Sequence, residues 1–212
     1  MRLKRRSVRG LLPVFVTLLI LFEIMAYTST VTRTQDQFFQ LYVLGSTGFA
    51  DNYFPKNSSS LRLGETVKWN VGVVNDMGSL QYVSIRVKLG NATINPPNDT
   101  LATASPSPLI AEFDQFILNN GTWQIPLVWQ VANYTTSSGG QVTIRSIAMD
   151  NMTYSIQGPV TCESITTCNF RMIFELWTWN VETAAFQIGW ISANQRQIAW
   201  LQLWFALSTY SP

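Results

Sequence analysis

Apolar and polar residues alternate through much of the chain after residue 37. In the segment 66–74 every second residue is apolar, namely Val67, Trp69, Val71 and Val73. Residues 82–89 and 122–131 follow the same period of two. One buried face and one solvated face are typical of strands in antiparallel sheets. Because Pro126 cannot donate to a β-ladder, we expect the third segment at a sheet edge or with a bulge.

Turn-forming residues separate these segments. Asn-Asp-Met-Gly occupies 75–78, Asn-Asn-Gly occupies 119–121 and Ser-Ser-Gly-Gly occupies 137–140, and such residues favour tight turns. The pattern predicts further strands at 38–44, 113–118, 141–149, 171–180, 186–191 and 197–207. About nine short strands with turns between them predict an all-β protein, an immunoglobulin-like antiparallel β-sandwich.

A basic head and an apolar segment precede the strands. Five of the 14 basic residues fall in the first ten positions: Arg2, Lys4, Arg5, Arg6 and Arg9. The pattern predicts a cytoplasmic head at 1–10, a transmembrane signal anchor at 11–29, a linker at 30–37 and an extracytoplasmic domain at 38–212. Glu23 lies in the outer third of the anchor, where it can reach lipid headgroups or a partner helix.

Two other interpretations of the apolar segment stay open. A cleaved signal peptide fits the charged head, although Ala-Tyr-Thr-Ser at 26–29 is a mediocre cleavage site. The third interpretation rests on Arg9-Gly10 before the apolar run, which resembles the processing site of archaeal pilins. That resemblance implies cleavage after Gly10 and a filament subunit whose apolar segment packs against copies of itself.

Charge and composition limit the functions of the folded part. Beyond Tyr27 the chain has nine basic and eleven acidic residues, a net charge of −2, and it contains no histidine. A nucleic-acid partner is therefore not expected, since phosphate contacts need a basic surface. Without histidine the usual nucleophilic triads cannot form, and the commonest metal ligand is missing. Glu112 and Asp114 share a strand face and are interpreted as solvated charges. The sequence thus predicts no enzyme, no cofactor and no metal.

Six Asn-x-Ser/Thr sequons lie in predicted loops or at strand ends. They begin at Asn57, Asn91, Asn98, Asn120, Asn133 and Asn151. Such positions can carry a glycan without disturbing a core, which predicts a glycoprotein exposed outside the cell.

Cys162 and Cys168 are the only cysteines, and their closeness predicts a disulfide that closes a short loop in an oxidising compartment. Free thiols and a metal site are the alternatives, the latter disfavoured because two thiols cannot complete a tetrahedral shell.

Aromatic residues gather in the last third of the chain. Trp177 and Trp179 share one face of a predicted strand. Packing is the ordinary role of such residues, but an exposed pair would stack on sugar rings or bind a protein partner. We therefore name Trp177 and Trp179 as a candidate binding face. The partners expected from the sequence are membrane lipid at the N-terminal helix, other envelope proteins or glycans, and further copies of the chain.

Three motifs occur in an order that resembles a known family. They are Tyr-Val-Leu-Gly at 42–45, Gly-Glu-Thr-Val at 64–67 in a strand that ends in Asn75, and Leu-Gln-Leu-Trp at 201–204. Over residues 38–207 the chain resembles the archaeal membrane proteins grouped as domain of unknown function 1616. The resemblance implies membrane helices joined to an outer domain on an archaeal cell surface, and no activity. A single-pass envelope protein with a structural or binding role is the leading hypothesis; a pilin-like subunit and an accessory subunit of a membrane complex are the alternatives.

Overall fold

The computed structural model describes residues 8–30, 37–163, 168–192 and 194–208. The chain divides into two units, residues 1–35 and 36–212. The first contains one helix, α1 (Val8–Thr30), whose side chains are exposed from residue 13 to residue 27. Pro13 lies near its start, where a helix tolerates proline, and Thr17 Oγ1 donates to the Pro13 carbonyl at 2.8 Å.

Among the described residues, no helix is long and apolar enough to cross a membrane. The transmembrane helix predicted at 11–29 is therefore not confirmed. Most of the predicted basic head and linker lie outside the described residues, at 1–7 and 31–36.

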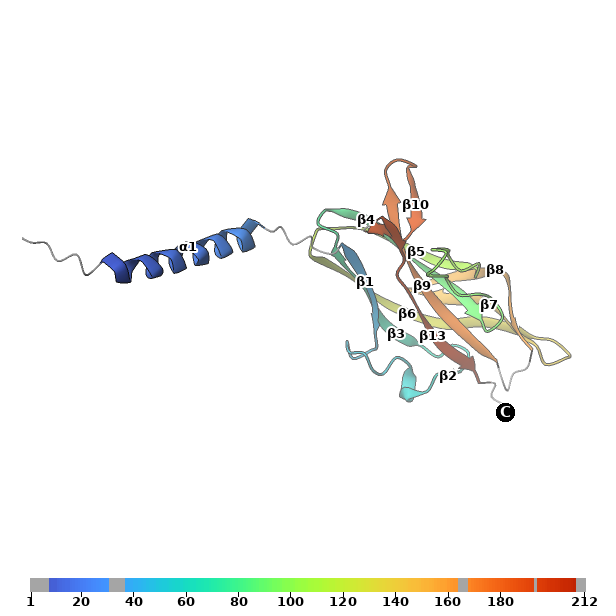
Figure 1. Ribbon diagram of the computed structural model, residues 1–212. Coiled ribbons are helices and arrows are strands. Elements are labelled where there is room, and N and C mark those ends of the chain that lie inside the picture. Colours follow the sequence, from blue (N-terminus) through green and yellow to red (C-terminus); the bar gives the residue numbers. More distant parts are fainter. Residues whose placement is uncertain (1–7, 31–36, 164–167, 193, 209–212) are drawn as a thin grey trace, which may run out of the picture. The chain divides into compact units, whose positions relative to one another are not determined.

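The second unit consists of strands in two facing sheets (Figure 1). The first sheet has the order β1-β3-β6-β7-β8, and all its neighbours are antiparallel. Its strands are β1 (Phe38–Leu44), β3 (Val67–Asp76), β6 (Gly121–Thr136), β7 (Val142–Met149) and β8 (Met152–Cys162).

The second sheet has the order β2-β13-β9-β4-β5, with β10 also paired to β9. Its strands are β2 (Ser60–Leu61), β13 (Trp200–Leu207), β9 (Asn169–Asn180), β4 (Gln81–Asn91), β5 (Leu109–Ile117) and β10 (Ala185–Ile188). Pairing is antiparallel except between β2 and β13. A hairpin of β11 (Trp190–Ser192) and β12 (Gln195–Gln197) and the short 3₁₀ helix η1 (Pro55–Asn57) complete the described elements. The all-β prediction is confirmed.

One hydrophobic core fills the space between the sheets. The side chains at 67, 69, 71 and 73 are buried, as the alternation predicts. Trp69 meets Trp129 of the same sheet at 5.0 Å between ring centroids and Phe174 of the opposite sheet at 5.8 Å. Aromatic pairs at these distances add to the stability that area burial provides.

Two features of β6 and β8 follow from proline. Residues 121–128 of β6 have β3 as their neighbour, and pairing with β7 begins at Trp129. Pro126 therefore lies where a missing N–H costs no ladder bond, which agrees with the predicted edge position. The register shifts of β6 lie further along, after Val131. Strand β8 was not predicted, and its register shift leaves residues 156–159, which include Gly158-Pro159, opposite Arg145.

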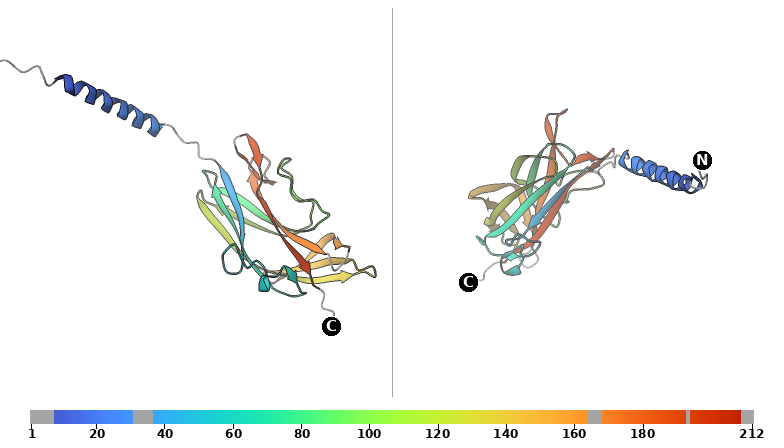
Figure 2. Two further views of the ribbon diagram at one scale, coloured as in Figure 1. Left: turned by 60° about the horizontal axis from the view of Figure 1, so that its bottom comes forward. Right: turned by 90° about the vertical axis from the view of Figure 1, so that its left-hand side faces the viewer.

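Several strands begin or finish at the same end of the β-sandwich. Phe38 pairs with Asp76, and Gln81 pairs with Ile117, so β1 and β4 begin at the end where β3 and β5 finish. The turn between β9 and β10 lies at this same end, which we call the hairpin end (Figure 1). The connection of residues 92–108 passes over the second sheet on the side away from the first sheet (Figure 2). We call this connection the covering loop.

Candidate functional site

The outer face of the second sheet carries the residues with most functional promise. Register places Tyr82 beside Phe116 and Trp179, and places Arg86 beside Glu112 and Glu175. Because side chains alternate along a strand, every second residue of β4 and β9 reaches this face. The face has a charged part beneath the covering loop and an aromatic part at the hairpin end.

A buried ion pair forms the centre of the charged part. Lys88 Nζ lies 2.9 Å from Glu175 Oε2, and the two residues are 8% and 0% exposed. The covering loop supplies further partners, since Ser105 donates its N–H to Glu175 Oε1 at 2.7 Å and accepts from Lys88 Nζ at 2.6 Å through its carbonyl. Trp177 Nε1 donates at 3.0 Å to Glu175 Oε2, the oxygen that also contacts Lys88. A buried pair is tolerable only with such additional hydrogen bonds.

A second ion pair lies closer to solvent. Arg86 Nη2 is 2.9 Å from Glu112 Oε1, and the Arg86 guanidinium lies 3.8 Å from the centre of a Trp177 ring. Ser84 Oγ also donates to Glu112 at 3.0 Å. Trp177 is thus held between a cation and a buried carboxylate. Its indole is a packing group here, and it presents little free surface to a ligand.

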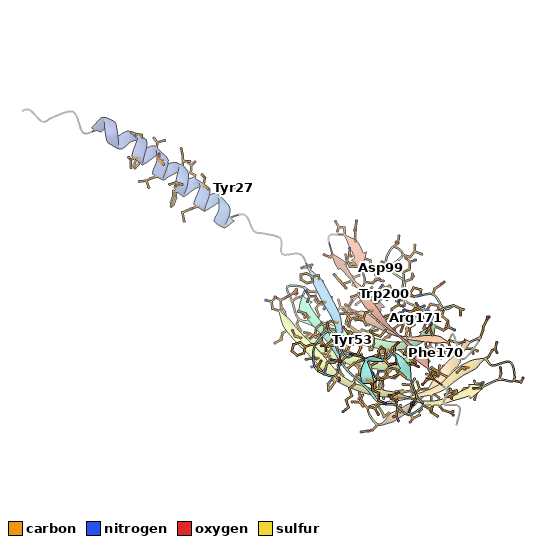
Figure 3. All side chains as sticks on the ribbon, turned by 90° about the horizontal axis from the view of Figure 1, so that it is seen from below. Tyr27, Tyr53, Asp99, Phe170, Arg171 and Trp200 are labelled. Carbon is orange, nitrogen blue, oxygen red and sulfur yellow. The ribbon has the colours of Figure 1, made fainter. Side chains whose placement is uncertain are left out.

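Arg171 is a second buried cation on this face. Its Nη1 donates to Gln202 Oε1 at 2.7 Å, its Nη2 donates to the Ile94 carbonyl of the covering loop, and its guanidinium lies 4.9 Å from the Trp204 ring. Burial lowers the pKa of Arg171 from its usual value. In Figure 3, Asp99 of the covering loop lies beside Trp200, whose Nε1 donates to Asp99 Oδ1 at 2.9 Å. These contacts attach the loop to the sheet.

A row of aromatic side chains crosses four strands at the hairpin end. Phe116, Tyr82, Trp179 and Phe186 come from β5, β4, β9 and β10 and are cross-strand neighbours. Tyr82 stacks on Phe116 with centroids 4.3 Å apart, and Trp179 meets Phe186 edge to face at 5.2 Å. Phe116 is 61% exposed, and Trp179 is exposed as well. The rings pack on one another, and Phe116 and Trp179 are the more exposed members of the row.

A second apolar row continues the first beyond the ends of the strands. Leu118, Leu80 and Val181 follow Phe116, Tyr82 and Trp179 at a spacing of two residues, on the side of the hairpin end. All three are exposed, Val181 to 83%. They lie just beyond the ends of β5, β4 and β9 and extend the exposed apolar surface at the hairpin end.

The predicted pair Trp177 and Trp179 therefore shares a sheet face as expected but occupies two environments. Trp177 belongs to the charged part, and Trp179 belongs to the exposed aromatic row. Sequence reasoning missed Tyr82, Phe116 and the ion pair of Lys88 with Glu175. Arg86 and Lys88 alternate with apolar residues in one predicted strand, so the sequence could assign them to the outer face. It could not identify their partners, because these depend on a strand register that the sequence does not specify.

Five of the six sequon asparagines are exposed: Asn57, Asn98, Asn120, Asn133 and Asn151. Asn91 is the exception and corrects the prediction that every sequon is accessible. It is 4% exposed, and its Nδ2 donates to the Thr161 carbonyl at 2.7 Å. Its Oδ1 accepts the backbone N–H groups of Thr93 and Ile94. A glycan needs both that nitrogen and free space, so Asn91 is unsuitable as an attachment site in this fold.

The two cysteines are free thiols in the structure, so the predicted disulfide is not formed there. Cys162 is half-buried and Cys168 is buried, and their side chains are hydrogen-bonded to each other. Burial raises the pKa of both thiols; at Cys162 the hydrogen bond from Cys168 opposes the shift. Residues 164–167 of the intervening loop lie outside the described part of the chain.

Few other described residues are arranged for catalysis or metal binding. No group of three or more His, Cys, Asp and Glu side chains that could hold a metal occurs among the described residues. Glu112 is occupied by Arg86 and Ser84, so it does not form a free carboxylate pair with Asp114. Glu23 lies on the exposed surface of α1. The arrangement on the outer face thus offers surfaces for binding.

Comparison with known proteins adds no family. No family model matches the chain, and no curated protein matches it, so the resemblance to domain of unknown function 1616 stays a prediction. Among solved structures the chain is similar to the β-glucosidase from Listeria innocua in complex with gluconolactone, with 11% identity and a TM-score of 0.30. That similarity covers 82% of this chain and 16% of the glucosidase chain.

Proposed function

We propose that this chain is a membrane-anchored protein of a cell envelope, whose N-terminus is cytoplasmic and whose β-sandwich is displayed outside for structural or binding work. An archaeal setting follows from the family resemblance. The observation that carries the proposal is an exposed apolar helix joined to a domain with accessible sequons. No catalytic residue is part of the proposal.

The side chains of α1 support the part of the proposal that places this helix in lipid. Its exposed large apolar side chains lie on all sides of the helix and include Val14, Phe15, Val16, Leu18, Leu19, Ile20, Leu21, Phe22 and Ile24. A helix that is hydrophobic all round is buried in a membrane or a large core. Of these two surroundings, the basic residues that precede α1 favour a membrane.

The strand order supports an immunoglobulin-like topology for the displayed domain. The sheet β1-β3-β6 facing the sheet β13-β9-β4-β5 follows the order A-B-E against G-F-C-C′ of immunoglobulin-like sandwiches. In that assignment β7 and β8 are an added hairpin at the edge of the first sheet. Domains of this architecture present loops and sheet faces to partners at cell surfaces.

The exposed asparagines support an extracytoplasmic location. Asn57 is the last residue of η1, Asn98 and Asn151 lie in connections between strands, and Asn133 lies at a register shift. A glycan attached at these exposed positions would meet solvent. We propose that at least two of the exposed sequons are used.

The test is the N-terminal sequence and intact mass of the protein isolated from its native envelope. A start at residue 1 or 2 supports a retained anchor. A start at Leu11 replaces the proposal with a pilin-like filament subunit, and a start near Thr28 replaces it with a secreted domain. A mass equal to the 23.9 kDa of the bare chain overturns the glycoprotein part.

A further inference from the structure

The exposed apolar surface at the hairpin end has no role in the function proposed so far. We define the hairpin-end patch by Leu80, Phe116, Leu118, Trp179, Val181 and Phe186. Phe116, Trp179 and Phe186 lie on the outer face of the second sheet, and Leu80, Leu118 and Val181 lie just beyond the strand ends. Exposed clusters of this kind mark interaction sites, whereas single exposed apolar residues do not.

We infer that the hairpin-end patch docks the β-sandwich onto the surface of the lipid bilayer that holds α1. This inference rests on the proposed function, because it assumes the anchor. It adds a second contact with lipid, made by the displayed domain itself.

Chain connectivity selects this end of the domain. Seven residues, 31–37, separate Thr30 at the end of α1 from Phe38 at the start of β1. A linker of that length reaches at most about 25 Å. Strand β9 has 12 residues and spans about 40 Å. If the opposite end of the domain faced the bilayer, Phe38 would lie about 40 Å from it, which is farther than the linker reaches. The hairpin end, where Phe38 lies, is therefore the end nearest to the bilayer.

The side chains of the patch suit a bilayer interface. Tryptophan is enriched at the level of the lipid headgroups, and phenylalanine, leucine and valine enter the acyl region below. Val181 and Leu118 stand beyond the strand ends, at the leading edge of the surface. The patch contains no basic residue, so apolar burial drives the contact, and zwitterionic lipid suffices. A salt-sensitive contact with anionic lipid would need Lys or Arg.

Asn120 lies two residues after Leu118 and is exposed at the same end. A glycan there would hold the patch away from lipid, because the sugar is bulky and strongly hydrated. The inference therefore requires that Asn120 is unmodified in the native protein. Full glycosylation at Asn120 would overturn it.

The experiment uses the full chain reconstituted into phosphatidylcholine vesicles that contain a phospholipid with a diazirine in its acyl chain. After irradiation, lipid adducts are mapped by mass spectrometry of proteolytic peptides. We expect adducts on α1 and on peptides that contain the patch, with equal yield in low and high salt. The double variant Phe116→Ser with Val181→Ser should lose at least about tenfold of the patch labelling, since burial of one such group alone shifts an equilibrium by about that factor.

Leu63→Ser is the matched control. Leu63 is an exposed leucine before β3, at the opposite end of the domain, and its loss should leave all labelling unchanged. The single variant Val181→Ser, at the tip of the hairpin, keeps the test valid if the double variant misfolds.

The outcomes separate the two proposals. Adducts on α1 without adducts on the patch overturn the docking and leave the anchor. Adducts on neither segment overturn the anchor as well as the docking. Equal labelling around Leu63 and the patch shows non-specific contact and overturns the docking alone.

Discussion

The buried pair of Lys88 and Glu175 gives the sharpest test of the structure. Replacement of Lys88 by Met removes the cation and keeps an apolar chain of similar length. Glu175 would then retain the Ser105 N–H and Trp177 Nε1 donors but lose its charge partner in a site with no exposure. Removal of one partner from a buried pair costs about 3–5 kcal/mol. A domain with a free energy of unfolding of about 5–15 kcal/mol is greatly weakened by that loss.

Arg86→Met is the matched control, on the same strand and face two residues away. Arg86 and Glu112 have side chains that are 23% and 30% exposed, so their pair contributes no more than about 1 kcal/mol. The stacking on Trp177 adds about 0.5–1 kcal/mol. We therefore expect Arg86→Met to cost about 1–2 kcal/mol, clearly less than Lys88→Met.

The assay is urea unfolding of the full chain in detergent, followed by tryptophan fluorescence. The double variant Lys88→Met with Glu175→Gln closes a mutant cycle. It removes both charges together, so it should be more stable than the sum of the single effects by at least about 2 kcal/mol. Equal costs for Lys88→Met and Arg86→Met, or additive single effects, would refute the buried pair.

Three further predictions concern other parts of the domain. Burial raises the pKa of the Cys162 and Cys168 thiols, so iodoacetamide at pH 8 should modify them more slowly than free cysteine, and the rate should increase as the pH rises. After unfolding, both thiols should be modified completely without reductant. A need for reductant would contradict free thiols. Glycopeptide mapping should find Asn91 unmodified, and Asn91→Ala should cost about 1–3 kcal/mol in urea unfolding because it leaves the Thr161 carbonyl unpaired; a glycan at Asn91 would disprove its burial. A Cβ on Gly72 would lie 2.1 Å from the Tyr42 ring, so Gly72→Ala should lower the free energy of unfolding by about 1–3 kcal/mol. This loss should largely vanish in a Tyr42→Ala background, and an equal loss there would reject the contact.

The sequence predicted the strands well because their evidence is local. Alternation at 66–74, 82–89 and 122–131 identified β3, β4 and β6 together with their buried faces. It failed at β8, where Gly158-Pro159 is typical of a turn but lies within a register shift that places residues 156–159 opposite Arg145. It also could not give the register, since the partners Tyr82 and Trp179 are far apart in the chain. The aromatic row exists only through that register.

The same reasoning explains why the candidate site was only half predicted. Alternation assigns a residue to a face but says nothing about what covers that face. Ser84 and Lys88 were expected in solvent because Val83, Ile85, Val87 and Leu89 point inward, yet both are buried. The covering loop contributes Ser105 to the ion pair and Asp99 to a hydrogen bond with Trp200.

The covering loop also accounts for the difference between Trp177 and Trp179. The loop and Arg86 screen the charged part of the outer face, where Trp177 lies, and the loop contacts described above stop short of the aromatic row. One sheet face therefore changes along its length from a sealed polar network to an exposed apolar surface. Buried charges need partners, because an unpaired buried charge is costly, and the partners of Lys88, Glu175 and Arg171 include backbone groups of the covering loop. The apolar surface has no such cover from the described chain, and in the docking that we propose above lipid covers it.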